Sequence, residues 1–249
     1  MKKQKKLLLQ RGIFLFIIFV LLGVIIVTEK AHTLMIPKIN KKIENYINKN
    51  YLDIKEALKI DNLIYKNSNY SLKITDSKNK YHYFYIYYEN NKIKDTYKED
   101  FKEGKPLMNH LKENLEKEIL ERTKTNTKVE IIANLNQFTT STQDRLLKEE
   151  NLLELKFYTL EKEILIDNWN SKEIVSSIIK TINKYQEKGI TPKYYNIIIT
   201  NKNNIKDSIT IKQLKEDFIN SQENEQIIKE ILNNNKDSLL LKKYKITYQ

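Results

Sequence analysis

Hydrophobic residues follow three distinct patterns along the chain, and each pattern predicts a different kind of element. Residues 12–28 form an uninterrupted apolar run without a charged side chain. Apolar residues recur at spacings of three and four in residues 39–54 and again in residues 107–122, which is typical of amphipathic helices. Between these two helices, residues 63–97 alternate in polarity, which predicts a meander of three or four antiparallel strands.

The second half of the chain repeats these patterns with different spacing. Asn170 or Ser171 is expected to cap a helix that runs to about Tyr185, and Gly189 is expected to end it. The remaining expected segments are strands at 129–135, 154–166, 194–200, 205–211 and 239–248, a polar connection with some helix at 141–150, and a helix that includes 227–232.

The order of these elements predicts the fold class and the domains. We expect an α+β protein with one N-terminal transmembrane helix, followed by two small α+β domains built on antiparallel sheets. The polar stretch at 124–128 is the expected domain boundary. A membrane-proximal domain would then occupy residues 29–123, and a C-terminal domain would occupy residues 124–249.

The apolar run at 12–28 predicts a membrane anchor. Its 17 residues make a helix of about 25 Å, slightly shorter than a hydrocarbon core of about 30 Å. Basic residues precede the run, which favours a cytoplasmic tail at 1–11 and an extracytoplasmic location for residues 29–249. A cleaved signal peptide is the alternative, but no pair of small residues marks a cleavage site after the run. The lipid bilayer is thus the first expected partner.

The net charge of +12 indicates little about partners once its location is considered. Five of the 44 basic residues precede the apolar run, so residues after it carry a net charge of +7 that is interleaved with acidic residues. A solvated surface is the favoured interpretation, and a patch for anionic wall polymer is the alternative. Nucleic acid is not expected as a partner, because an exported domain rarely meets it.

The composition argues against several kinds of chemistry. The chain has no cysteine, which excludes disulfides and zinc–thiolate sites, and its 4 glycines form no phosphate-binding loop. His32, His82 and His110 are far apart in sequence, so we expect structural or surface histidines and neither a metal nor a cofactor.

A pair of carboxylates is the remaining catalytic candidate. Asp95 with Glu99 or Asp100 has the residue types that a glycosidase needs. Nothing in the sequence distinguishes this pair from the other acidic residues. Solvated charges, or an Asp95 side chain that binds nearby backbone at a strand end, are the favoured interpretation.

The tyrosines of residues 81–88 are the strongest candidate for a functional surface. Alternation along a strand places Tyr81, Tyr83, Tyr85 and Tyr87 on one side of the predicted sheet. As a binding surface they would supply broad area and hydroxyl groups to a protein, a peptide or a glycan. As core residues they would be covered by the helices predicted at 38–55 and 107–122, and both hypotheses remain open.

The first half of the chain resembles a known family. Residues 43–51 read IENYINKNY, and they are followed by Tyr-containing strands and by the Asp95-x-Tyr97 motif. This order, after a basic tail and one membrane span, is similar to that of the YfjL-like proteins, small membrane-anchored proteins of Gram-positive bacteria. The resemblance covers residues 10–122. It implies a topology and a fold, and no activity, because none is assigned to the family.

These observations lead to three hypotheses about function. The favoured one is a non-enzymatic, single-pass, extracytoplasmic module that binds another envelope protein or a peptide. The second is a binder of anionic cell-wall polymer or glycan, which would use the tyrosines and the basic excess. A wall or peptide hydrolase with a carboxylate pair is the least favoured.

Overall fold

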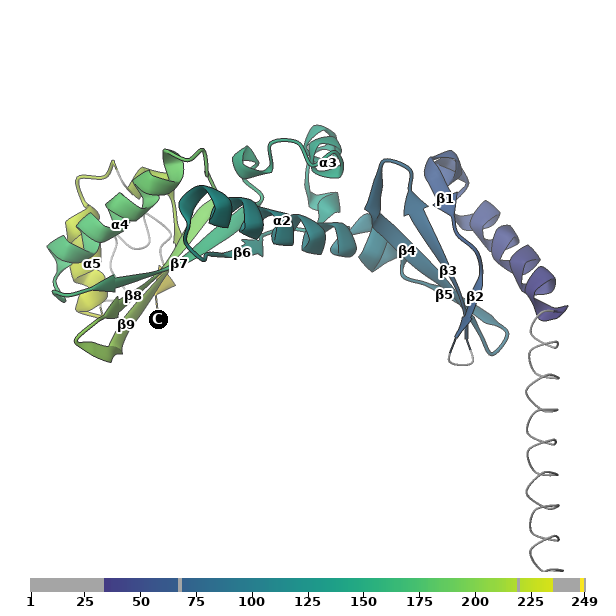
Figure 1. The fold of residues 1–249 in the computed structure, drawn as a ribbon, viewed down its shortest axis with the longest axis horizontal. Coiled ribbons are helices and arrows are strands. Elements are labelled where there is room, and N and C mark those ends of the chain that lie inside the picture. The colour runs from purple at the N-terminus through teal and green to yellow at the C-terminus, as the bar shows by residue number, and fades with distance from the viewer. Residues whose placement is uncertain (1–33, 67–68, 219, 235–246, 249) are drawn as a thin grey trace, which may run out of the picture. The chain divides into compact units, whose positions relative to one another are not determined.

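The computed structural model describes residues 34–66, 69–218, 220–234 and 247–248, and Figure 1 shows its elements. It is an α+β protein, as the sequence predicts, with two sheets and several helices. The chain divides into two compact units, Met1–Tyr97 and Lys98–Gln249.

The expected anchor at 12–28 lies outside the described residues, as does most of the strand expected at 239–248. Among the helices that the structure describes, none is both long enough and apolar enough to cross a bilayer. The membrane anchor therefore stays a prediction from the sequence.

Among its described residues, the first unit contains one α-helix and a five-stranded antiparallel sheet. Its elements are the helix at 34–50, the short 3-10 helix η1 (Leu52–Ala57), and the strands β1 (Leu58–Ile60), β2 (Ile64–Lys66), β3 (Asn69–Asp76), β4 (Asn79–Glu89) and β5 (Lys92–Asp95). The strand order is β1-β3-β4-β5, and β2 pairs with β3 beside β1. The meander predicted at 63–97 is thus present, and β1 is an addition to it.

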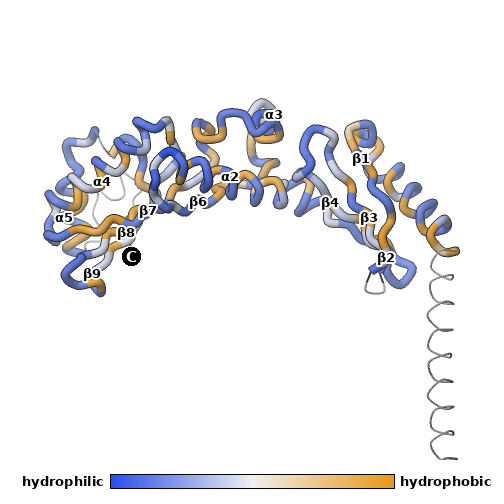
Figure 2. The backbone as a smooth tube through the Cα atoms, in the orientation of Figure 1, coloured by the Kyte–Doolittle hydropathy of each residue, from blue (hydrophilic) through white to orange (hydrophobic). Residues whose placement is uncertain are grey.

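The core of the first unit lies between the helix at 34–50 and one side of the sheet. Ile39, Ile43 and Ile47 follow each other at four-residue spacing and are almost completely buried. Phe84 and Ile86 of β4 are fully buried on the sheet side. Figure 2 shows the hydrophobic positions of the helix and of β3. Burial of each such side chain contributes about 1.5–3 kcal/mol to stability.

The second unit contains four α-helices and a five-stranded sheet among its described residues. The helices are α2 (Lys105–Thr123), α3 (Thr140–Leu147), α4 (Ser171–Gln186) and α5 (Asn224–Leu232), with short helical turns η2 (Tyr97–Lys102), η3 (Leu135–Gln137), η4 (Leu152–Glu154) and η5 (Glu216–Phe218). The strands are β6 (Lys128–Ile131), β7 (Tyr158–Ile166), β8 (Tyr194–Asn201), β9 (Asn204–Leu214) and β10 (Thr247–Tyr248).

The second sheet has one parallel pair that the sequence interpretation did not include. The strand order is β10-β9-β8-β7-β6, and β7 pairs with β8 in parallel while the other pairs are antiparallel. The crossover helix α4 connects β7 to β8 and returns the chain to the same end of the sheet. Periodicity shows which residues of a strand share a side, but it does not show the direction in which a neighbour runs.

The division between the units differs from the expected boundary at 124–128. Helix α2 was expected to pack on the first sheet, but it belongs to the second unit. A carboxylate oxygen of Glu116 in α2 accepts the backbone N–H of Val129 in β6 at 3.0 Å, which ties the helix to the second sheet. The apolar spacing of α2 reveals a buried side, and it does not reveal which sheet that side covers.

Candidate functional site

The four tyrosines named from the sequence lie on the side of the first sheet that faces away from the core. Tyr81, Tyr83, Tyr85 and Tyr87 are all partly exposed, whereas Phe84, Ile86 and Tyr88 on the other side of β4 are buried. The helix at 34–50 packs on that buried side, where Lys42 Nζ donates to the hydroxyl of Tyr88 at 2.9 Å. The helix predicted at 38–55 therefore does not cover the four tyrosines.

We call this side of the sheet the tyrosine face, defined by Tyr81, Tyr83, Tyr85 and Tyr87 with the side chains that point to the same side from the neighbouring strands. The rings of Tyr83 and Tyr85 lie 5.6 Å apart at an angle of 80°, and those of Tyr85 and Tyr87 lie 5.9 Å apart at 27°. Lys73 Nζ, from β3, lies 3.9 Å from the centre of the Tyr83 ring. The rings of Tyr83, Tyr85 and Tyr87 thus pack against one another.

A second cluster of tyrosines surrounds a carboxylate where β5 ends. The hydroxyls of Tyr46 and Tyr51 both donate to Oδ2 of Asp95, the latter at 2.5 Å. The backbone N–H of Tyr97 donates to Oδ1 of Asp95 at 3.0 Å. The Tyr51 ring also lies 4.5 Å from the ring of Tyr97. The structure thus brings together the tyrosine just after the 34–50 helix and the Asp-x-Tyr motif, two features that the resemblance had named separately.

This cluster has a structural role, and we call the contacts of Tyr46 and Tyr51 with Asp95 the clamp. Burial raises the pKa of Tyr51 and of Tyr46, and the hydrogen bonds to Asp95 raise both further. Burial and the nearby Asp95 charge also raise the pKa of Tyr97. The phenols therefore stay protonated and act as donors. A carboxylate that already accepts three hydrogen bonds is a poor general base, so the cluster does not favour the hydrolase hypothesis.

The expectation that Asp95 binds nearby backbone at a strand end is confirmed by its contact with Tyr97. The two phenol contacts were missed by the sequence analysis. Tyr46 and Tyr51 lie 49 and 44 residues from Asp95 in sequence, so no local pattern could reveal the contacts.

His82 forms a buried pair with a carboxylate in the same unit. Its Nδ1 lies 2.9 Å from Oδ2 of Asp76, and both side chains are less than a tenth exposed. The other oxygen of Asp76 accepts the backbone N–H of Lys78 at 2.8 Å. Burial opposes ionisation of Asp76, but the hydrogen bonds from His82 and Lys78 outweigh it and hold the pKa of Asp76 below its usual value. This is a structural histidine at the β3–β4 turn.

His110 contacts two polar side chains of the second unit. Nε2 of His110 on α2 lies 2.9 Å from the amide nitrogen of Asn114 and 3.3 Å from a carboxylate oxygen of Glu149. His32 lies outside the described residues. In the part of the chain that the structure describes, no group of three or more His, Asp or Glu side chains is arranged to hold a metal ion.

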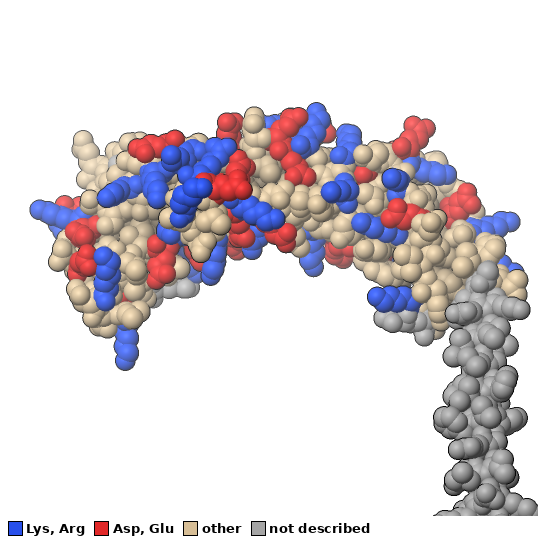
Figure 3. All heavy atoms as spheres, in the orientation of Figure 1, with Lys and Arg blue, Asp and Glu red and all other residues tan. Residues whose placement is uncertain are grey.

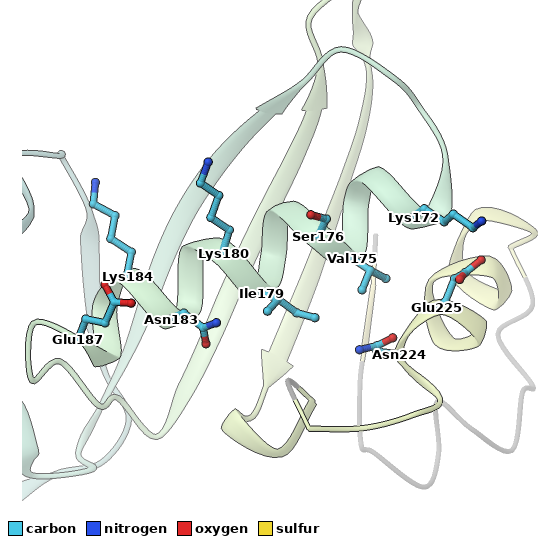
Figure 4. Close-up of a pocket in the computed structure, with 10 residues that line it drawn as sticks. All are labelled: Lys172, Val175, Ser176, Ile179, Lys180, Asn183, Lys184, Glu187, Asn224 and Glu225. Atoms are coloured by element: carbon cyan, nitrogen blue, oxygen red, sulfur yellow. The ribbon is translucent and has the colours of Figure 1, made fainter.

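A groove of about 870 Å³ runs along α4 in the second unit and reaches the start of α5. In Figure 4, Ile179 and Asn183 point to one side of α4, and Lys180 and Lys184 point to the other. The two carboxylates that line the groove lie at opposite ends of α4. Glu187 follows the last residue of the helix, and Glu225 accepts a hydrogen bond from Ser171 at its start. A helix of this length separates them by roughly 20 Å, too far for paired acid–base catalysis.

Charged side chains are spread widely over both units. Figure 3 shows lysine and arginine interleaved with aspartate and glutamate on the visible side of each unit. This distribution agrees with the solvated surface that the sequence predicts. The visible side therefore shows no large patch of a single charge.

Together these features define a two-unit α+β protein whose most distinctive surface is an aromatic sheet face. No protein-family model matches the chain, and no match was found among curated proteins or among solved structures. The resemblance to the YfjL-like proteins stays a prediction that rests on the residues quoted above.

Proposed function

We propose that this chain is a non-enzymatic interaction module of the cell envelope, and that its tyrosine face binds another envelope protein or a peptide. In this proposal residues 12–28 anchor the chain in the membrane, the N-terminus is cytoplasmic, and residues 29–249 are extracytoplasmic. The uncharged run and the basic residues before it support this topology.

The observation that carries the proposal is the placement of four tyrosines opposite the core of the first unit. A sheet needs one apolar side to pack against its helix, and Phe84 and Ile86 already fill that role. The aromatic side chains on the other side are not needed for the core. Tyrosine is enriched in protein interfaces because it combines a large area with a hydroxyl group and has few rotatable bonds.

The second candidate is a binder of anionic wall polymer or glycan. The position of Lys73 over the Tyr83 ring favours it, because this places an ammonium group next to aromatic surface. An anionic sugar polymer can pair its charge with the ammonium group and contact the edges of the neighbouring rings. A hydrolase has no comparable support, since Asp95 of the candidate carboxylate pair and the buried Asp76 are both engaged in structural hydrogen bonds.

A site-specific crosslinking experiment tests the favoured function. A photo-reactive amino acid would replace Tyr85 in the full-length chain, expressed in the cells that naturally produce it. We expect one reproducible envelope protein or peptide to be captured at this position. The matched control places the same amino acid at Tyr194, a partly exposed tyrosine of β8 in the second unit.

The outcome can separate the two candidate functions. Capture of the same protein from Tyr85 but not from Tyr194 supports the protein or peptide partner. Capture of wall fragments alone, released by wall digestion, supports the binding of wall polymer or glycan and contradicts a protein or peptide partner. Absence of any specific product at Tyr85 contradicts both uses of the tyrosine face.

A further inference from the structure

The strand pairing places a concentration of lysines on the tyrosine face. Five lysines have side chains on this side of the sheet. Four of them pair with residues of a neighbouring strand that point to this side, and the fifth alternates with the buried residues of β3. They are Lys59 on β1, Lys66 on β2, Lys73 on β3, and Lys92 and Lys94 on β5. The carboxylate that the strands contribute to the same side is Glu89, 3.6 Å from Lys94.

This balance differs from the interleaved charges on the side of the molecule that Figure 3 shows. Five ammonium groups against one carboxylate, within one sheet face, favour a partner that carries negative charge. The hydroxyl groups of the four tyrosines add further hydrogen-bond donors beside the lysines. The tyrosine face is therefore rich in donors and suited to carboxylate oxygens.

The rings favour a peptide over a stacked sugar. One side of the Tyr83 ring is occupied by Lys73, and Tyr85 packs against the ring at 80°. Tyr85 and Tyr87 pack against each other at 5.9 Å. A sugar that stacks on an aromatic ring needs an open ring face, and these contacts use part of that surface. Peptide side chains have no such need and can bind to the hydroxyl and ammonium groups directly.

The rows that hold these lysines, which lie on β1, β3 and β5, are spaced like alternate residues of an extended chain. Successive rows across the sheet hold Lys59 with Tyr83, then Lys73 with Tyr85, then Lys94 with Tyr87, and then Lys92 with Glu89. Adjacent rows on a strand are two residues, or roughly 6.8 Å, apart. An extended peptide presents every second side chain at the same spacing.

We propose that the tyrosine face binds an extended peptide segment that carries acidic side chains at every second position. This inference rests on the proposed function of the same face and adds the chemistry of the partner. Each acidic side chain of the segment meets one row. In the first three rows a lysine supplies the charge and a tyrosine supplies area and a hydroxyl, and in the fourth row Lys92 supplies the charge beside Glu89. The ion pairs with the lysines fix the register of the segment on the sheet. The aromatic side chains exclude water from the contact between the segment and the sheet.

Fluorescence anisotropy with defined peptides tests this inference on the purified full-length chain in detergent, at an ionic strength of about 0.15 M. The probe is a labelled dodecapeptide in which glutamate and threonine alternate. The comparison peptide has the same composition, with all glutamates in one block. We expect the alternating peptide to bind about fivefold more tightly, since it places one carboxylate in each row.

A pair of matched double variants locates the site. Lys59→Gln with Lys73→Gln should weaken binding of the alternating peptide about fivefold, as expected for two exposed ion pairs. Lys180→Gln with Lys184→Gln removes the same charge from α4 and should leave affinity unchanged. Circular dichroism on both variants checks that the fold is retained.

Several results would overturn the inference. Equal affinity for the two peptides would show that the spacing of the glutamates has no role. An equal loss of affinity in the two double variants would show that binding depends only on the net charge of the protein. Tight binding of soluble polyglycerol phosphate without peptide binding assigns the face to an anionic polymer. If the crosslinker at Tyr85 captures an envelope protein while both peptides fail to bind, the proposed function stands and the acidic segment is wrong.

Discussion

The hydroxyl of Tyr51 lies 2.5 Å from Oδ2 of Asp95, and this contact joins the residue after the first described helix to the last residue of β5. Tyr46, one turn earlier, donates to the same oxygen. The pair of phenols therefore fixes the helix relative to the sheet edge. Because the helix fills the core side of the sheet, the clamp also determines which side remains for the four tyrosines of β4.

Removal of the Tyr51 hydroxyl should weaken the first unit measurably. Tyr51→Phe keeps the ring contacts with Phe84 and Tyr97 and loses the contacts of its hydroxyl with Asp95 and Tyr46. Because hydrogen bonds to charged groups contribute about 1.5–3 kcal/mol, and Tyr46 remains bonded to the same oxygen, we expect a loss of about 1–2 kcal/mol. Hydrogen exchange of β4 and β5 amides would measure the loss in this unit.

A double-mutant cycle provides the control for this prediction. Tyr46→Phe should cost less than Tyr51→Phe, because its side chain is more exposed. The double variant should cost more than the sum of the single changes, since it leaves Oδ2 of Asp95 without either phenol donor. Full additivity would show that the two phenols act independently and that no shared clamp exists.

The same cluster predicts a loss of stability at alkaline pH. Burial and the contact with Asp95 raise the pKa of Tyr51 and of Tyr46 in the folded chain, so the unfolded chain releases its protons first. The stabilising contribution is complete below the unfolded pKa of about 10 and is lost as pH rises through the folded values. Urea midpoints between about pH 9 and pH 11 should fall, and less steeply in Tyr51→Phe.

Buried tyrosines of the second unit also contribute to this loss of stability at alkaline pH. The informative quantity is therefore the difference in pH dependence between Tyr51→Phe and the wild type. Burial raises the pKa of Tyr158 and of Tyr195 as well. Tyr194→Phe, which leaves the cluster of the first unit intact, should reproduce the wild-type slope. If Tyr51→Phe and wild type lose stability in parallel, the clamp is not the origin of the effect.

The Asp76–His82 pair predicts a separate loss at acid pH. The pKa of Asp76 is below its usual value in the folded chain, so its contribution is present above the unfolded pKa and is lost as pH falls through the folded value. We expect the loss to begin below about pH 4. Asp76→Asn should lower stability by about 1–3 kcal/mol at pH 7 and flatten the acid dependence. Hydrogen exchange of β3 amides between about pH 3 and pH 7 would measure both effects, and an unchanged profile in Asp76→Asn would contradict this role.

The local structure of the chain was largely predictable from the sequence. The alternation in β4 identified both its sides. Of the two expected caps, Asn170 and Ser171, the structure has Asn170, whose side chain accepts the backbone N–H of Glu173 at 3.0 Å. These features depend on neighbours within a few residues. Propensity and spacing describe such neighbours directly.

Relationships between distant segments were not predictable in the same way. The assignment of α2 to the second sheet, the parallel pairing of β7 with β8, and the contact between Tyr51 and Asp95 all depend on how elements pack. For the candidate site, the sequence identified the four tyrosines of β4. Only the packing of the helix at 34–50 showed that they lie opposite the core, and whether they bind a partner stays a prediction.

Among the described residues, Gly104 and Gly189 have positive φ, and they offer a matched test of packing in the second unit. Gly104 has φ 69°, and a Cβ added there would lie 2.7 Å from Cβ of the buried Leu135. Gly189 has φ 72°, but its added Cβ would lie 3.4 Å from Nη1 of Arg122, at the end of a flexible side chain. Both substitutions to alanine incur the cost of a left-handed backbone, about 1–2 kcal/mol, and only Gly104→Ala must also displace a core residue.

We therefore expect Gly104→Ala to lower stability by about 2–4 kcal/mol and Gly189→Ala by about 1–2 kcal/mol. Urea unfolding followed by the fluorescence of Trp169, the single tryptophan of the chain, would measure both changes in the second unit. Equal losses would mean that Leu135 moves without cost. In that case the start of α2 would not be held by its contact with the 3-10 turn η3, and the helix would depend on β6 for its position.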